Sequence, residues 1–205
     1  MSTSKSIALT FAFLLFASNS ALSAQEPTTQ TTSATTRAKT DRSNLEVQVH
    51  LLVASSDAAA KETVPQALQP FVRELRQSLP DAKYNLAGTY TSRMKAGSTI
   101  ENKGMVAAKL LMGQDYSGVA SFYEYALTVA LATDGPALTI EIPRFRFGLQ
   151  LPLFTGMNPP KYDYHLTGIT TELTLREGTP TLAGTMTTIN PNQFLIVVIS
   201  VRRTQ

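Results

Sequence analysis

Alternation between apolar and polar side chains is the feature that most constrains the fold of this chain. In residues 45–54, Leu45, Val47, Val49, Leu51 and Val53 fall on one side of an extended backbone. Successive side chains of a strand point to opposite faces, so this pattern predicts a strand that is buried on one face. Residues 84–95 alternate in a similar way. The chain is therefore expected to fold mainly as β-sheet.

Turn signals divide the rest of the chain into further extended segments. Strands are predicted at residues 99–111, 119–132, 138–153, 162–175, 179–189 and 194–201, with turns or loops at 96–98, 134–136, 156–160 and 176–178. A helix is the alternative at 119–132, because its Ala, Leu and Glu residues are good helix formers. Residues 194–201 are apolar at both odd and even positions, which predicts a central strand buried on both faces.

The buried set of residues 138–153 changes parity at Pro143. Leu138, Ile140 and Ile142 precede the proline at even positions, whereas the apolar residues from Phe145 to Leu153 are odd. A shift of one residue turns every side chain to the other face. A bulge or strand break at Pro143 would keep both sets buried.

One segment carries a helical pattern instead. Its apolar residues recur every three or four positions: Leu68, Phe71, Val72, Leu75 and Leu79. Thr63 is predicted to cap this helix, Pro65 suits its first turn, and Pro80 is predicted to end it. Counting these segments gives about eight strands and one amphipathic helix, so the fold class is α+β and mainly antiparallel β-sheet. We expect residues 44–205 to form a single globular domain.

The first residues indicate a targeting signal rather than part of the folded domain. Lys5 precedes an apolar run at residues 7–17, and small residues lead to Ala24. This is the pattern of a secretory signal peptide at residues 1–24, and the run is shorter than the about 20 apolar residues that span a membrane as a helix. Residues 25–43 are rich in Thr and Ser and are predicted to be a disordered linker. We expect an exported protein, periplasmic or extracellular after cleavage near Ala24.

The composition indicates the cellular compartment of the protein and excludes one class of partner. The chain contains no cysteine, so neither disulfides nor a lipid-modified cysteine can form. This favours a bacterial envelope, with a eukaryotic secreted protein as the alternative. Removal of residues 1–24 leaves 17 basic residues (18 − 1) and 15 acidic ones, scattered along the chain, so no nucleic-acid partner is expected. Membrane association by other means than a spanning helix stays open.

Residues that could carry catalysis are few. His50 and His165 are the two histidines and there is no cysteine, so no metal site and no cofactor are expected. Asp163 and His165 share one face of a predicted strand, where a carboxylate could orient an imidazole base. A surface hydrogen bond is the favoured interpretation of this pair, and an enzyme is not expected.

Four residues are the predicted binding candidates. Arg144 and Arg146 share the polar face after Pro143, and Tyr162 and Tyr164 follow the next loop. Together they could form a basic and aromatic surface that recognises an envelope protein or a glycan.

The closing residues resemble a known family. In residues 173–185, Glu177-Gly178 forms a turn between two strands, and the apolar strand at 194–201 follows. This stretch is similar to the late strands of bacterial outer-membrane secretins. The resemblance implies an envelope domain of related sheet topology and no catalytic residues.

The sequence thus predicts an exported, non-enzymatic envelope protein, a periplasmic interaction or accessory domain of a secretion or surface assembly. A small eight-stranded outer-membrane β-barrel is one alternative. A carrier of an apolar ligand, or a hydrolase that uses Asp163 and His165, is the other.

Overall fold

The computed structural model describes residues 43–57, 60–106, 111, 119–132, 139–157, 160–188 and 190–204. The predicted signal peptide and all of the predicted linker except Ser43 lie outside these residues. The described elements are, in chain order, β1 (Asn44–Ser55), a 3-10 turn (Gln66–Leu68), α1 (Gln69–Ser78), β2 (Lys83–Lys95), β3 (Thr99–Val106), β4 (Ser121–Ala132), β5 (Thr139–Met157), β6 (Pro160–Arg176), β7 (Thr181–Thr187) and β8 (Gln193–Arg203).

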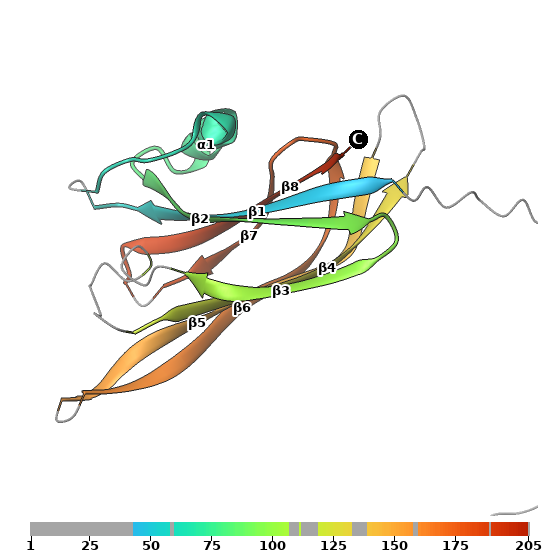
Figure 1. Cartoon of the computed structure of the whole chain (residues 1–205). Coiled ribbons are helices and arrows are strands. Elements are labelled where there is room, and N and C mark those ends of the chain that lie inside the picture. Colours follow the sequence, from blue (N-terminus) through green and yellow to red (C-terminus); the bar gives the residue numbers. More distant parts are fainter. Residues whose placement is uncertain are drawn as a thin grey trace, which may run out of the picture. The chain divides into compact units, whose positions relative to one another are not determined.

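These strands form two four-stranded sheets (Figure 1). The first sheet has the order β2-β1-β8-β7 and the second has the order β3-β4-β5-β6. All neighbouring strands are antiparallel. The predicted class, mainly antiparallel sheet with one amphipathic helix, agrees with this arrangement. The described strands do not form one closed eight-stranded sheet.

The main core lies between the two sheets. The inward side chains of β1, Leu45, Val47, Val49 and Leu51, pack in one cluster with residues such as Phe147 of β5. Because strand side chains alternate, each sheet supplies every second residue to this core and leaves the others on an outer face. Burial of these apolar side chains is the main term that stabilises the sandwich.

The helix α1 covers part of the outer face of the first sheet. Phe71 and Val72 of α1 form a second cluster with Leu52 of β1 and with Ile196 and Val198 of β8. Val197 and Ile199 of β8 face the main core instead. The prediction that residues 194–201 form a central strand buried on both faces is confirmed.

The start of α1 differs from the prediction. Thr63 does not cap the helix, because its backbone pairs with β2: Thr63 N–H donates to Tyr84 O and Leu86 N–H donates to Thr63 O. Leu68 is the N-cap residue, and Pro70 lies in the first turn, where its missing N–H leaves no hydrogen bond unmade. The helix ends at Ser78, directly before Leu79 and Pro80, as predicted.

Strand β5 contains the predicted irregularity at Pro143. Its pairing with β6 shifts register between Ile142 and Phe145, and both of these side chains are buried. The helical alternative for residues 119–132 is wrong, because Ser121–Ala132 is the strand β4. Strand β3 ends at Val106, and the predicted continuation over 107–110 lies outside the described residues.

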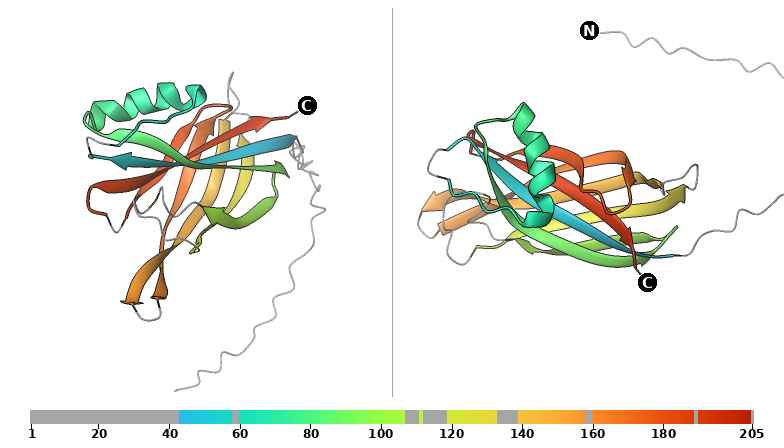
Figure 2. Two further views of the ribbon diagram at one scale, coloured as in Figure 1. Left: turned by 60° about the vertical axis from the view of Figure 1, so that its left-hand side comes forward. Right: turned by 90° about the horizontal axis from the view of Figure 1, so that it is seen from above.

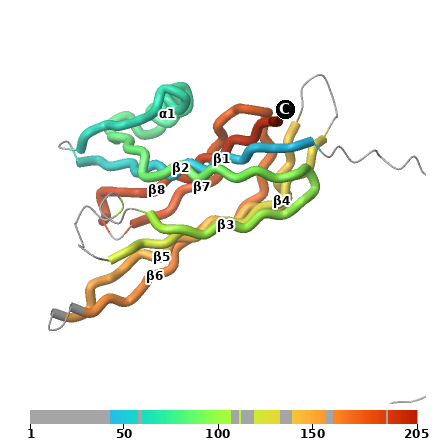
Figure 3. The backbone as a smooth tube through the Cα atoms, in the orientation of Figure 1, coloured from blue at the N-terminus to red at the C-terminus, as the bar shows by residue number. Residues whose placement is uncertain are grey.

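Strands β5 and β6 continue beyond their neighbour. Phe122 of β4 pairs with Gln150, whereas residues 151–157 of β5 pair with β6 alone. The two strands run on side by side as an arm, residues 151–157 and 160–165 (Figure 3). The loop predicted at 156–160 is shorter than expected, because Gly156 and Met157 belong to β5 and Pro160 belongs to β6. The predicted turns at 96–98 and 176–178 are present, with Gly97 and Gly178 at positive φ.

Candidate functional site

The four predicted binding residues lie on the outer face of the second sheet, at two separate places. Arg146 of β5 is opposite Thr170, whereas Tyr164 of β6 is opposite Pro152. Arg146 and Pro152 are six residues apart in β5 (152 − 146), which is about 20 Å along a strand. The structure therefore places the arginines and the tyrosines on one face but does not bring them together.

The arginine end of this face has mixed charge. Arg144 and Arg146 are exposed and line a depression of about 330 Å³ together with Glu101 of β3. Glu141 and Glu172 are also exposed near this end. The basic surface expected from the sequence is thus a surface in which acidic side chains accompany the arginines.

The opposite end is apolar. Exposed large hydrophobic side chains gather there, and we call them the apolar face: Met105, Phe122, Phe154, Tyr164 and Leu166. They account for five of the seven exposed large hydrophobic side chains among the described residues. Met105 is 70% exposed and Leu166 is 62% exposed. Exposed apolar patches of this kind mark sites of interaction.

Strand register explains why these residues meet. Met105 is opposite Phe122, Phe122 is opposite Gln150, and Gln150 is opposite Leu166. One row across the sheet therefore joins residues that lie far apart in the sequence. Tyr164, two positions before Leu166, points to the same face.

Ring contacts extend the apolar face along the arm. The rings of Phe122 and Tyr164 have centroids 5.8 Å apart, and Tyr164 Oη donates a hydrogen bond of 3.1 Å to Ala120 O. At the outer part of the arm, Phe154 and Tyr162 meet edge to face with centroids 5.6 Å apart. Contacts of this kind restrict the motion of aromatic side chains, which reduces the entropy cost of any binding at this face.

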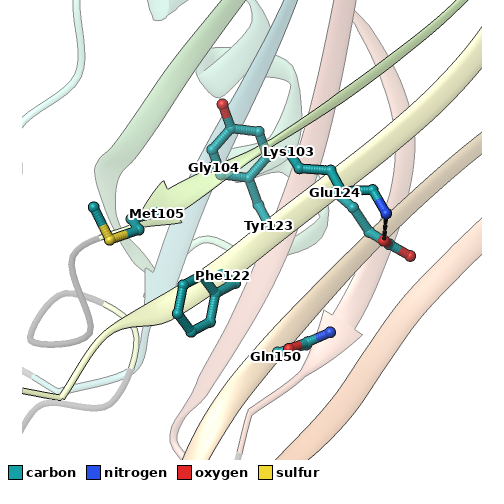
Figure 4. Close-up of a pocket in the computed structure, with 7 residues that line it drawn as sticks. All are labelled: Lys103, Gly104, Met105, Phe122, Tyr123, Glu124 and Gln150. Carbon is teal, nitrogen blue, oxygen red and sulfur yellow. Dashed lines mark ion pairs between the residues drawn. The ribbon is translucent and has the colours of Figure 1, made fainter.

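A depression of about 380 Å³ lies beside Phe122 and Met105 (Figure 4). Lys103 and Glu124 form an ion pair of 3.3 Å at one side of it, and Gln150 lies at another. Figure 4 shows Tyr123 turned away from Phe122, as expected for consecutive residues of a strand. The lining can contact an apolar group and fix its position by hydrogen bonds.

A polar network connects the two sheets on the inner side. Tyr125 Oη lies 2.7 Å from Ser92 Oγ, and Asn102 Nδ2 donates to Ser92 Oγ over 3.1 Å. Tyr123 Oη donates to Asn102 Oδ1, and its ring stacks on Tyr90 at 3.7 Å. Burial raises the pKa of Tyr90, Tyr123 and Tyr125, so these phenols stay protonated at neutral pH. The network has a structural role, since it ties β2 to β3 and β4.

Asp163 and His165 both lie on strand β6. Both are exposed on the arm, and no hydrogen bond between them occurs in the described part of the chain. His50 is buried in β1 instead, with Nδ1 3.0 Å from Thr89 Oγ1.

Within the described ranges, no group of three or more His, Asp or Glu side chains could hold a metal ion. The same ranges contain no helix that is long and apolar enough to cross a membrane.

Tyr164 is the one residue of the apolar face that was predicted from the sequence; Met105, Phe122, Phe154 and Leu166 were not. Large apolar residues at outward positions were the available signal: Phe122 stands among small even-numbered residues of β4, and Leu166 follows Tyr164 by two. Whether these residues lie next to one another depends on the strand pairing, which periodicity alone does not define.

Comparison with known proteins gives matches among solved structures only. No family model matches the chain, and no curated protein matches it. The chain is similar over 80% of its length to the InvG secretin domain of the Salmonella SPI-1 injectisome, with 11% identity and a TM-score of 0.39. Over the same share it is similar to the type II secretin GspD of enteropathogenic Escherichia coli, with 8% identity and a TM-score of 0.43.

A third similar structure is the type II secretion secretin XcpQ from Pseudomonas aeruginosa, with 8% identity and a TM-score of 0.35. The match covers 64% of the InvG chain, 70% of the GspD chain and 59% of the XcpQ chain. These structures are secretins, the family that the closing residues resemble.

Proposed function

We propose that the protein is an exported, non-enzymatic interaction domain of the cell envelope, an accessory of a secretion or surface assembly. It binds a partner protein through the apolar face. The observation that carries this proposal is the grouping of Met105, Phe122, Phe154, Tyr164 and Leu166 on one face of the second sheet.

The energetics support binding rather than a structural role. Exposed apolar side chains contribute little to folding, whereas covering them with a partner removes their surface from water. Aromatic side chains in the centre of an interface typically carry most of its binding energy, at about 2 kcal/mol or more each. Phe122, Tyr164 and Phe154 are suited to this role because β4, β5 and β6 hold them on a regular sheet.

The export part of the proposal is supported by the sequence. Lys5, the apolar run at residues 7–17 and the small residues before Gln25 have the order of a secretory signal. Arg144, Arg146 and Tyr162 belong to the same outer face and are proposed to lie at the border of the interface.

Photo-crosslinking in expressing cells tests the proposal. A photoreactive phenylalanine analogue replaces Tyr164 in one variant, and Arg73, an exposed residue of α1 on the first sheet, in a matched control. We expect a discrete crosslinked protein from position 164 and none from position 73. A protein that stays uncrosslinked from both positions would refute the interaction role.

A further inference from the structure

The helix α1 leaves one end of the outer face of the first sheet uncovered (Figure 2, right). This open end has three rows of outward residues, defined by the pairing of β8, β1 and β2. The rows are Ser200–Gln48–Thr91, Arg202–Glu46–Arg93 and Thr204–Asn44–Lys95. Every residue in these rows is polar or charged, and none is among the exposed large hydrophobic side chains.

Glu46 organises the arginines of the middle row. Its side chain is only 7% exposed, because two guanidinium groups cover it. Arg202 donates from Nε at 3.0 Å and from Nη2 at 2.6 Å to Glu46 Oε1, and Gln48 Nε2 donates to the same oxygen at 2.9 Å. Arg93 Nε lies 3.8 Å from Glu46 Oε2. The hydrogen bond from Arg202 holds the pKa of Glu46 below its usual value, so the carboxylate stays charged.

The same arginines remain available to solvent. The Arg202 side chain is 60% exposed and the Arg93 side chain is 79% exposed. An arginine has five N–H donors, so a guanidinium that is fixed at one edge by Glu46 still presents donors at the other. The two hydrogen bonds to Glu46 position the Arg202 guanidinium before any ligand arrives, which reduces the entropy cost of binding.

The open end carries a local excess of positive charge. The three rows contain Arg93, Lys95 and Arg202 and one carboxylate, Glu46, which gives a net charge of +2 (3 − 1). Neighbouring Arg203 is paired with Glu177. Arg93, Lys95, Asn44 and Thr204 also line a depression of about 370 Å³. This contrasts with the outer face of the second sheet, where glutamates accompany the arginines.

We propose that this basic face, Arg93, Lys95 and Arg202, binds an extended acidic segment of a partner protein. The charge complementarity selects carboxylates, and guanidinium groups bind carboxylates with directed, charge-assisted hydrogen bonds. Arg93 and Lys95 are two residues apart on β2, about 6.7 Å, which is also the spacing of alternate side chains in an extended peptide.

The surroundings favour a peptide over a lipid surface. Gln48, Thr91 and Ser200 offer hydrogen-bonding groups to a peptide backbone, and the three rows contain no apolar side chain that would enter a bilayer. The basic face and the apolar face belong to the outer sides of different sheets. Both can therefore be occupied at once, and the domain would connect two partners.

A binding measurement with defined peptides tests this inference. The probe is a capped synthetic peptide of alternating Glu and Thr, and the control peptide has Gln in place of each Glu. The protein is the full chain purified after export. We expect the Glu peptide to bind with an affinity that falls as NaCl rises, and the Gln peptide not to bind.

Paired double variants locate the site. Arg93→Gln/Lys95→Gln is expected to weaken binding by at least about tenfold. Lys61→Gln/Arg73→Gln removes the same charge from residues outside both faces and is expected to change the affinity by less than about twofold. All four side chains are exposed, so both variants should keep the thermal unfolding midpoint of the parent.

Three results would overturn the inference: no binding of the Glu peptide, an equal loss in both double variants, or binding to phosphatidylglycerol vesicles that depends on Arg93 and Lys95 while the peptide fails. None of these results bears on crosslinking at position 164. A failure of this inference and a failure of the proposed function are therefore distinguishable.

Discussion

Gly168 of β6 lies opposite Gly148 of β5, between the mixed-charge end and the apolar face of the second sheet. A Cβ atom at Gly168 would lie 2.6 Å from the carbonyl oxygen of Phe147 and 3.2 Å from the Cα atom of Gly148. Both contacts are with backbone, which cannot rotate away. This pair of strands therefore requires glycine at position 168.

Replacement of Gly168 by alanine is expected to lower the free energy of unfolding by about 1–3 kcal/mol, because the strands must shift to admit the methyl group. Gly156→Ala is the matched control in the same hairpin, since its nearest neighbour would be Lys161 Cβ at 3.6 Å, an ordinary contact. Urea unfolding measures both variants. Equal stability of the two would contradict the close approach at Gly168.

His50 gives the fold a dependence on pH. Burial lowers the pKa of His50 from its usual value of 6.5, so the folded protein binds fewer protons than the unfolded chain. The free energy of unfolding therefore rises with pH. Stability is at its full value above the pKa that His50 has in the unfolded chain, and it decreases as the pH falls below that pKa.

We expect His50→Gln to flatten the decrease in unfolding free energy between pH 7 and pH 5. The pKa of Glu46 is lowered in the folded state, so its ionised carboxylate stabilises the fold above about pH 4.5, and this stabilisation is lost as the pH falls below that value. The loss of stability at low pH due to Glu46 is expected to remain in the His50→Gln variant. Urea titrations at several pH values measure the slope. An unchanged slope in His50→Gln would show that another group titrates in this range.

At the level of elements, α1 is attached by few side chains. Val72 is fully buried against the first sheet, whereas its neighbour Arg73 is exposed. Val72→Ala is expected to lower the free energy of unfolding by about 2 kcal/mol, through lost burial and the cavity left behind. Arg73→Ala should change it by less than about 0.5 kcal/mol. If the two variants unfolded alike, the packing of α1 on β1 and β8 would be in doubt.

Periodicity predicted the strands well and their ends less well. The alternation in residues 45–54 and the parity change at Pro143 were sufficient to predict the strand β1 and the register shift in β5. The prediction that β1 is buried on one face only was wrong, because Leu52 and Ala54 are buried in the second cluster. The start of α1 was predicted wrongly, because the backbone of Thr63 forms hydrogen bonds with β2 and Thr63 does not cap the helix. Tertiary hydrogen bonds of this kind override the local preference of a residue for a helix cap.

Sheet order decides which surface residues meet, and the sequence pattern does not contain it. Met105, Phe122 and Leu166 form one row only because β3, β4, β5 and β6 are neighbours in this order. Arg144 and Arg146 were predicted to lie near Tyr162 and Tyr164 because they are close in sequence. The long β5–β6 hairpin separates them, since its strands run about 20 Å between Arg146 and Tyr164's partner Pro152.

At the level of the whole molecule, the sandwich presents two outer faces of different chemistry. The second sheet carries the apolar face, and the open end of the first sheet carries the basic face. A regular sheet is a rigid support for either surface, so binding is expected to require little rearrangement of the backbone.

The most direct test combines crosslinking with stability. Met105→Ser/Leu166→Ser removes the two most exposed side chains of the apolar face, in a protein that carries the photoreactive residue at position 164. Glu101→Ser/Glu172→Ser, at the mixed-charge end, is the control. We expect the first variant to keep its unfolding free energy within about 0.5 kcal/mol and to lose its crosslinked partner, while the control retains both. A loss of stability of about 2 kcal/mol or more with crosslinking unchanged would mean that these side chains serve the fold, and would contradict the interaction role.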